Sequence, residues 1–319
     1  MTPPRSHAGL VYGLAAYGLW GLMPLYFRVV AEVAPLELLS HRIVWSVVLL
    51  AGLLTILRRW PKVWACLRQP KTCGLLVAST ILIAINWYFF IVGVSTKQVV
   101  QNSLGYFINP LFSILLGVVV FRERLRGAQW VALALASCGL GYLVVEGDQF
   151  PVIALSLAGS FSLYGLVRKV APVESLVGLT IETLFLTPLA AGALVFWASR
   201  GELMLGTLGT RVDSAVLASG VVTAVPLLCF GAAARRLPLS TMGFLQYLAP
   251  SLQFLIAVLV LGEPFRSEQR VGFPFIWSAL LIVTIDALMA RRARGREIAP
   301  DPVAGAAKTS PPSPPLPQG

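Results

Sequence analysis

The residues whose types and spacing could do chemistry lie first in one hydrophobic stretch. Asn102, Tyr106, Asn109 and Ser113 are four, three and four residues apart, so a helix would carry all four on one face. Pro110 stands among them, and a proline inside a helix leaves the carbonyl of Tyr106 without its usual hydrogen bond. In hydrocarbon that carbonyl needs a partner in protein or in a water-filled cavity. The pattern favours the lining of a solute cavity, although such polar faces also hydrogen-bond helices to one another.

A second stretch repeats this arrangement. Residues 237–266 match residues 97–126 without a gap, and Pro110 falls on Pro250. Gln246 and Gln253 flank the second proline, and Tyr247 lies beside them. Interrupted helices at corresponding positions of two halves are typical of the substrate site of a secondary transporter.

Other hydrophobic stretches hold residues that we expect to complete the wall of such a cavity. The further substrate-binding candidates are Trp20, Asn86 and Tyr164, and the further helix breaks are Pro24 and Pro226. Any single aromatic residue is explained equally well by packing or by a place at the membrane interface, so only their convergence carries weight. Tyr, Trp, Asn and Gln in an apolar wall suit a small amphipathic or aromatic solute rather than an inorganic ion.

Charged residues inside hydrophobic stretches are a second signal, because each costs roughly 2.5–3.5 kcal/mol at the bilayer centre. Glu182 is the main candidate for proton coupling and His41 is a second one. The alternative for Glu182 is a neutral, hydrogen-bonded carboxylic acid. Arg42 occupies the position equivalent to Glu182 in the other half, and we expect its long side chain to extend outward to the interface.

We expect the remaining acidic residues near helix ends to form ion pairs with nearby arginines. We expect Asp286 to pair with Arg291 and Arg292. Glu123 and Glu263 end their helices among arginines, so we expect them to form ion pairs on the loop side.

The composition indicates an integral membrane protein. Of the 319 residues, 57% are hydrophobic and 12% are charged, with a mean hydropathy of +0.79, whereas soluble domains carry about 25% charged residues. The net charge of +11 does not indicate nucleic-acid binding, because the basic residues form short clusters between hydrophobic stretches. The four cysteines lack the spacing of metal ligands, so neither a metal nor another cofactor is expected.

The stretches long enough to cross a bilayer predict an all-α protein of ten transmembrane helices in two inverted five-helix repeats. The repeats span 8–146 and 150–290, because the match between the halves extends over both and an odd number of helices turns the second one over. Most Lys and Arg residues then face the side of both termini, which places the termini in the cytoplasm. Residues 291–319 are basic and proline-rich, a composition that predicts a disordered cytoplasmic tail. The expected helices lie near 8–30, 36–57, 74–95, 99–121, 127–146, 150–168, 175–198, 213–234, 239–262 and 269–290.

Several strings resemble one known family. NSLGYFINPL (102–111), FRERLR (121–126), LTIETL (179–184), STMGFLQYLAPS (240–251) and LGEPF (261–265) are similar to the RarD branch of the EamA family, in the drug/metabolite transporter superfamily. The resemblance covers residues 8–290. It implies a ten-helix permease of a bacterial-type inner membrane, with a central cavity between two halves and export of small metabolites or drugs.

Two other functions stay open from the sequence. One is a membrane-embedded enzyme acting on lipid-linked substrates, with Glu182 or His41 as base. The other is a membrane scaffold or sensor that transports nothing. The sequence has no GxxxxGK[ST], HExxH or GxSxG motif, so a non-enzymatic transporter is the expectation. The expected partners are the lipid bilayer and a small solute, and the choice between monomer and homodimer stays open.

Overall fold

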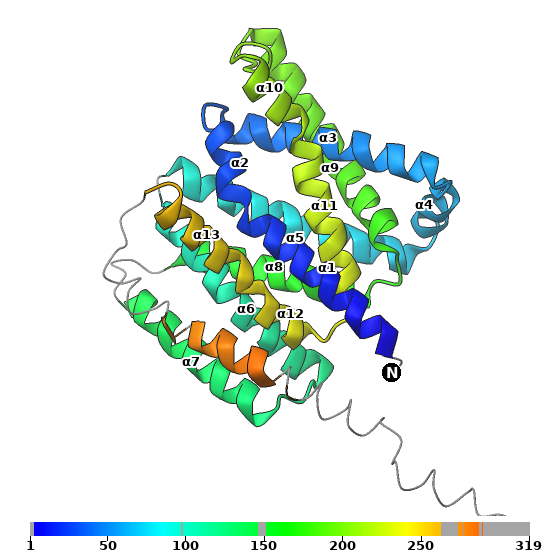
Figure 1. Ribbon diagram of the computed structural model, residues 1–319. Coiled ribbons are helices and arrows are strands. Elements are labelled where there is room, and N and C mark those ends of the chain that lie inside the picture. Colours follow the sequence, from blue (N-terminus) through cyan, green and yellow to red (C-terminus); the bar gives the residue numbers. More distant parts are fainter. Residues whose placement is uncertain are drawn as a thin grey trace, which may run out of the picture.

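The computed structural model describes residues 3–96, 98–145, 151–262, 274–275, 277–286 and 289. Within these ranges the chain is helical and contains no strand, which confirms the predicted all-α class (Figure 1). The labelled helices are α1 (Pro3–Gly21), α2 (Met23–Val29), α3 (Pro35–Ile56), α4 (Trp60–Leu67), α5 (Pro70–Ser95), α6 (Val99–Phe121), α7 (Gly127–Val145), α8 (Val152–Val170), α9 (Ser175–Arg200), α10 (Thr210–Leu217), α11 (Ser219–Ala234), α12 (Leu239–Gln246) and α13 (Leu248–Leu259).

Eight helical segments among the described residues are long and apolar enough to cross a membrane. They fall in eight of the predicted ranges and comprise His7–Val29, Pro35–Ile56, Pro70–Ser95, Asn102–Phe121, Val152–Val170, Ser175–Arg200, Thr210–Ala234 and Leu239–Leu259. Helix α7 occupies the predicted range 127–146, and Trp277–Asp286 is a short apolar helix inside the predicted range 269–290. Because much of that last range, Glu263 and the tail 291–319 lie outside the described residues, the count of ten helices stays a prediction.

The four prolines predicted as helix breaks behave in two ways. Pro24 follows an interruption at Leu22, and Pro250 follows the one at Tyr247. Helices α6 and α11 continue through Pro110 and Pro226 instead. A proline removes one hydrogen bond, and in a membrane helix the neighbouring turns and helices can compensate for it, so it does not always end the helix.

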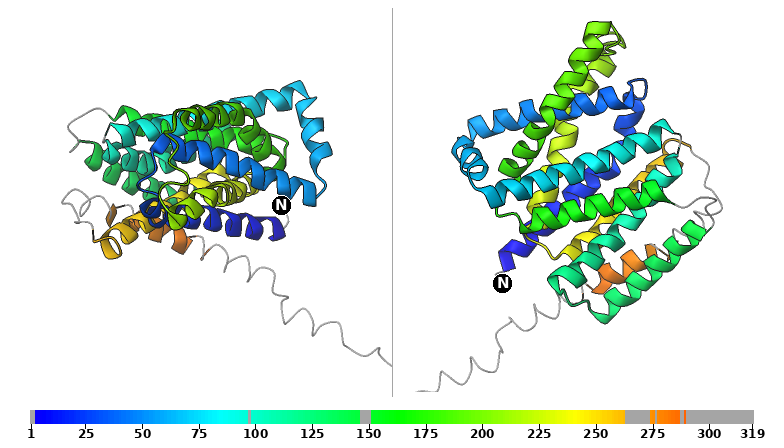
Figure 2. Two further views of the ribbon diagram at one scale, coloured as in Figure 1. Left: turned by 90° about the horizontal axis from the view of Figure 1, so that it is seen from above. Right: turned by 180° about the vertical axis from the view of Figure 1, so that it is seen from behind.

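The helices pack with partners from the other half of the sequence. Helix α6 packs against α8 and α12, α3 against α9 and α11, and α1 against α11 and α13. The two views of Figure 2 show α3 and α9 crossing at one end of the bundle, with α7 and residues 277–286 at the other. The transmembrane core is therefore built between the halves rather than within each half.

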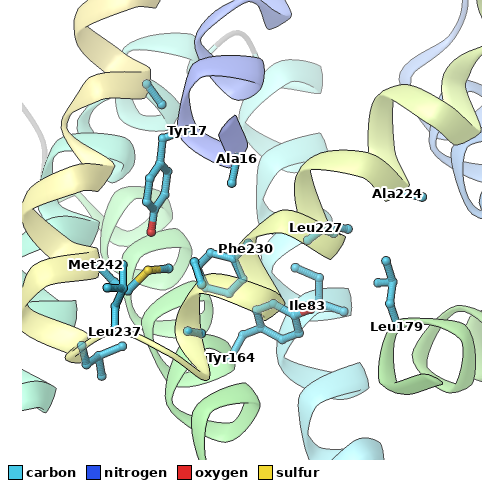
Figure 3. Packing of buried hydrophobic residues seen from close by; sticks show 14 of the residues in the cluster. Ala16, Tyr17, Ile83, Tyr164, Leu179, Ala224, Leu227, Phe230, Leu237 and Met242 are labelled. Carbon is cyan, nitrogen blue, oxygen red and sulfur yellow. The ribbon is translucent and has the colours of Figure 1, made fainter. Parts of the chain in front are cut away.

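A buried hydrophobic cluster contains residues of α1, α3, α5, α8, α9, α11, α12 and α13 (Figure 3). Tyr17 of α1, Tyr164 of α8, Phe230 of α11 and Met242 of α12 are each at most 2% exposed. The rings of Tyr164 and Phe230 are stacked, with centroids 5.8 Å apart and planes 15° apart. This cluster borders the cavity described next, because Tyr17 belongs to both.

Candidate solute cavity

The described helices line a cavity of about 230 Å³. Its wall comes from α1, α2, α3, α5, α6, α8, α11, α12 and α13, so both halves of the chain contribute. Seven of the lining residues are aromatic, namely Tyr17, Trp20, Phe27, Trp87, Phe90, Tyr106 and Phe161. This lining, apolar with a few polar groups, is typical of a site for a small organic molecule.

Many of the predicted site residues meet at this cavity. The lining includes Trp20, Pro24, Asn86, Tyr106, Asn109, Gln246, Pro250 and Gln253. They belong to six different helices, which explains why no single stretch of sequence defines the site. The structure thus brings together residues of both proline-containing stretches, and their roles in binding stay predictions.

The amide side chains in the wall also hold helices together. Asn86 Nδ2 donates to the carbonyl of Leu157 at 2.9 Å, and Gln253 Nε2 donates to the carbonyl of Trp20 at 2.9 Å. Asn109 Oδ1 accepts a hydrogen bond of 2.5 Å from Ser162. The two explanations of the polar faces therefore apply together, because one amide can both join two helices and border the cavity.

Four of the predicted binding residues lie outside the lining. Asn102 donates to the carbonyl of Phe90 at 3.0 Å, behind the wall. Ser113 lies 3.2 Å from Ser162 and donates to Gln246 at 3.4 Å. Tyr164 and Tyr247 are each 1% exposed within hydrophobic clusters. Spacing alone placed Asn102 and Ser113 on the same face as Asn109, but the cavity reaches only the middle of that face.

Arg42 is a charged lining residue that the sequence analysis did not place in the cavity. Its side chain was expected to extend outward to the interface, and this expectation is wrong: Arg42 lines the cavity, and its Nε donates to Thr223 Oγ1 of the adjacent helix α11 at 2.9 Å. The guanidinium carbon lies 6.0 Å from the ring centroid of Phe27 and 5.9 Å from that of Trp87. Two aromatic faces and a hydroxyl stabilise the cation within the bundle, so it has no need to reach the interface.

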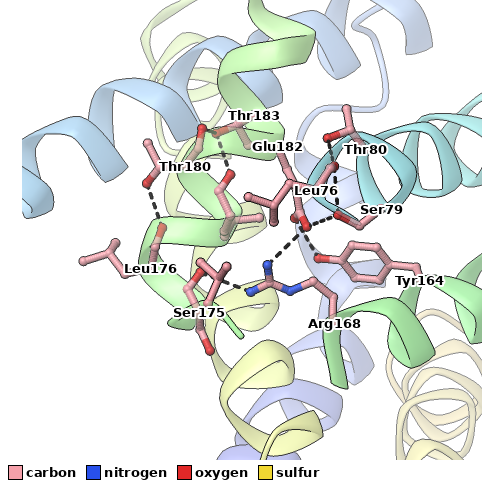
Figure 4. A network of polar contacts seen from close by, with 12 residues as sticks. Leu76, Ser79, Thr80, Tyr164, Arg168, Ser175, Leu176, Thr180, Glu182 and Thr183 are labelled. Atoms are coloured by element: carbon pink, nitrogen blue, oxygen red, sulfur yellow. Dashed lines mark hydrogen bonds and ion pairs between the residues drawn. The ribbon is translucent and has the colours of Figure 1, made fainter. Parts of the chain in front are cut away.

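Glu182 lies outside the cavity, in a buried network (Figure 4). Its carboxylate accepts hydrogen bonds from Ser79 at 2.5 Å and Tyr164 at 3.1 Å, and forms an ion pair of 3.2 Å with Arg168. The side chains of Arg168 and Glu182 are each 2% exposed, so this ion pair is buried within the helix bundle. The second candidate for proton coupling, His41, is also buried outside the cavity, with Nε2 3.6 Å from Glu37 Oε1.

Two of the three acidic residues near helix ends belong to the described residues, and Glu123 forms an ion pair, although with Lys169 at 3.9 Å and not with a neighbouring arginine. Asp286 pairs with Arg126 at 2.7 Å, which ties the helix 277–286 to the segment before α7, while Arg291 and Arg292 lie outside the described residues. Glu123 accepts hydrogen bonds from the backbone N–H groups of Leu239 at 2.7 Å and Ser240 at 2.8 Å. It caps the start of α12 in the other half of the chain, a partner that no local sequence pattern shows.

The fold defines a helical membrane protein whose two halves line one cavity, and comparisons with known proteins give its family. Residues 7–145 match the model of the EamA-like transporter family. An uncharacterized transporter of Vibrio cholerae is 44% identical over 93% of this chain and 99% of its own length. Protein RarD of Escherichia coli is 42% identical over 92% and 99% of the two chains. The chain belongs to the EamA-like transporter family as a RarD-type member, and it is a multi-pass membrane protein.

A solved crystal structure shares this fold. It is 20% identical in sequence and superposes with a TM-score of 0.68 over 88% of this chain and 98% of that chain. At this identity the likeness shows the arrangement of helices alone.

Proposed function

We propose that this protein is a secondary transporter that exports a small amphipathic or aromatic metabolite or drug across a bacterial-type inner membrane by alternating access. The observation that carries the proposal is the cavity, which is bordered by Asn109 of the first proline-containing stretch and by Gln246 and Gln253 of the second. Polar groups from corresponding proline-containing stretches of the two halves meet at this cavity, and the substrate sites of transporters lie where two repeats meet.

The proposal includes two inverted five-helix repeats, at 8–146 and 150–290, with both termini in the cytoplasm. The packing of the helices supports it, because contacts occur in pairs related by the match between the halves. Helix α6 packs against α8, and their counterparts α12–α13 and α1 are also in contact. Helix α5 packs against α8, and its counterpart α11 packs against α1. Two similar halves around one site can rock between inward and outward states.

The membrane-enzyme alternative gains no support from the site. Its two candidate bases, Glu182 and His41, border no part of the cavity, and the polar lining consists of amides, hydroxyls and one guanidinium. The described residues also contain no group of three or more metal-ligating side chains.

Thiol labelling tests the proposal directly. In a protein whose four cysteines have been replaced, Asn109→Cys should react with a membrane-impermeant thiol reagent from one side and lose this reactivity when a solute is bound. Asn102→Cys is the matched control on the same helix, because Asn102 is equally buried but lies behind the wall. A thiol at position 109 that stays inert from both sides in every condition would contradict alternating access through this cavity.

A further inference from the structure

The charge of the lining residues indicates which class of solute the cavity can bind. Among the described residues, Arg42 is the only charged one in its lining. Within the described residues, no carboxylate lies within 4 Å of its guanidinium group. Its one hydrogen bond uses Nε, so its two terminal nitrogens have no hydrogen-bond partner among those residues.

The match between the two halves of the sequence accounts for the missing acidic partner of Arg42. Arg42 stands where the second half has Glu182, and Arg28 stands where it has Arg168. In the second half the pair is an acid and a base that neutralise each other at 3.2 Å. In the first half both positions are cationic, and Arg28 is exposed outside the cavity. A cation inside a bilayer that has no partner of its own marks a functional position.

Building on the proposed function, we propose that the solute is an aromatic or amphipathic organic monoanion, and that Arg42 binds its carboxylate. The two free terminal nitrogens of a guanidinium form a planar fork that matches a carboxylate. The aromatic lining suits the body of such a molecule, with Phe27 and Trp87 beside the cation. One guanidinium balances one negative charge, so a doubly charged phosphate would leave a buried charge without a partner.

Matched probes of the same shape test this inference. We would measure the binding of indole-3-acetate and of its neutral analogue indole-3-acetamide to the purified full-length protein, and the uptake of both into proteoliposomes. The wild type should prefer the carboxylate. In Arg42→Gln the affinity for indole-3-acetate should fall roughly thirtyfold or more, while the affinity for the amide stays within about threefold, because only the ion loses its partner.

Two further variants separate charge from folding. Arg42→Lys keeps the cation but not the fork, so it should retain an intermediate preference for the carboxylate. Arg28→Gln removes an exposed cation of α2 outside the cavity and should leave both affinities unchanged. If Arg42→Gln does not fold, the loss of preference in Arg42→Lys relative to Arg28→Gln carries the test.

The outcomes distinguish this inference from the proposed function. Binding and flux of neutral or cationic aromatic solutes, with no preference for carboxylates, would overturn the monoanion inference and leave the transport proposal standing. An equal effect of Arg42→Gln on acid and amide would overturn the role of Arg42. If the wild type moved no aromatic solute of any charge, the proposed function itself would fail and the inference with it.

Discussion

Arg168 Nη1 lies 3.2 Å from Glu182 Oε1, and both side chains are 2% exposed between α8 and α9. Taking two charges out of water is costly, and their attraction compensates for this only with good geometry and further hydrogen bonds. Tyr164 and Ser79 donate to the same carboxylate, and Arg168 Nη2 donates to the carbonyl of Ser175 at 3.3 Å. Breaking such a pair from one side leaves a buried charge and costs about 3–5 kcal/mol.

Gly178 of α9 allows the ion pair to form. A Cβ at position 178 would lie 2.0 Å from Arg168 Nη1, so Gly178→Ala must displace the guanidinium from Glu182. We expect the free energy of unfolding to fall by up to about 3–5 kcal/mol, measured by thermal or denaturant unfolding in detergent. Gly192→Ala on the same helix meets nothing within 4 Å and should change stability little. Equal stability of the two variants would show that Arg168 relaxes without loss.

Glu182 is also the residue that we predict to couple transport to protons. If it is, transport by Glu182→Gln should no longer depend on a proton gradient, because an amide cannot release a proton. The measurement is uptake into proteoliposomes with and without an imposed pH difference. His41→Gln provides the comparison for the second candidate. A Glu182→Gln protein that keeps the full response to the gradient would leave Glu182 with a structural role alone.

The sequence predicted the elements better than the contacts. Hydropathy placed the spanning helices to within a few residues, and the proline-containing repeat identified Asn109 and Gln246 as residues that meet at one cavity. The position of the Arg42 side chain was mistaken, because the rotation of a helix about its axis decides what a long side chain reaches. Thr223, the partner of Arg42, lies 181 residues further along the chain. Periodicity cannot reveal such a partner, although the replacement of Glu182 by Arg42 in the repeat was a signal available in advance.

Glu123 joins the end of α6 to the start of α12. Its carboxylate accepts from two backbone N–H groups at a helix N-terminus, where a negative charge is favourable. We expect Glu123→Ala to lower the free energy of unfolding by about 1–2 kcal/mol, with Glu123→Gln losing less. Arg124→Ala, which removes an exposed neighbour, is the control. A Glu123→Ala protein as stable as the control would mean that water replaces the carboxylate at this helix end.

Glu174 lies outside the membrane-spanning segments and makes the stability of the protein depend on pH. The hydrogen bond from Lys62, with its charge and that of Arg59, outweighs the effect of burial and lowers the pKa of Glu174 below its ordinary value of 4.5. A carboxylate with a lowered pKa in the folded state stabilises it above the ordinary pKa, and this contribution is lost as the pH falls through the folded value.

The change that tests this is Lys62→Met, which removes the main partner of Glu174. Both groups are nearly half exposed, so the variant should lose at most about 1 kcal/mol of unfolding free energy at pH 7. The difference from wild type should shrink as the pH falls below about 4.5 and as salt rises. Lys71→Met, at an exposed lysine without an ion pair among the described residues, is the control. A difference that stays constant with pH would assign the effect to packing of the lysine stem.

The binding of a monoanion at Arg42 also makes transport sensitive to voltage. A carrier that moves one negative charge per cycle gains or loses roughly 2.3 kcal/mol per 100 mV, equivalent to about a fiftyfold concentration ratio. Exchange of the anion for a proton would move two charges in the same electrical sense and raise the sensitivity further. In an inside-negative cell both modes favour export, so the direction in the proposed function needs no additional ion.

Uptake of indole-3-acetate into proteoliposomes should therefore rise when valinomycin and a potassium gradient make the interior positive, and fall when they make it negative. Indole-3-acetamide moves one charge fewer per cycle, so it should not respond in the first mode and should respond less than the carboxylate in the second. Uptake of the carboxylate at equal rates under both would mean that it crosses with a compensating cation, which would contradict voltage-driven export.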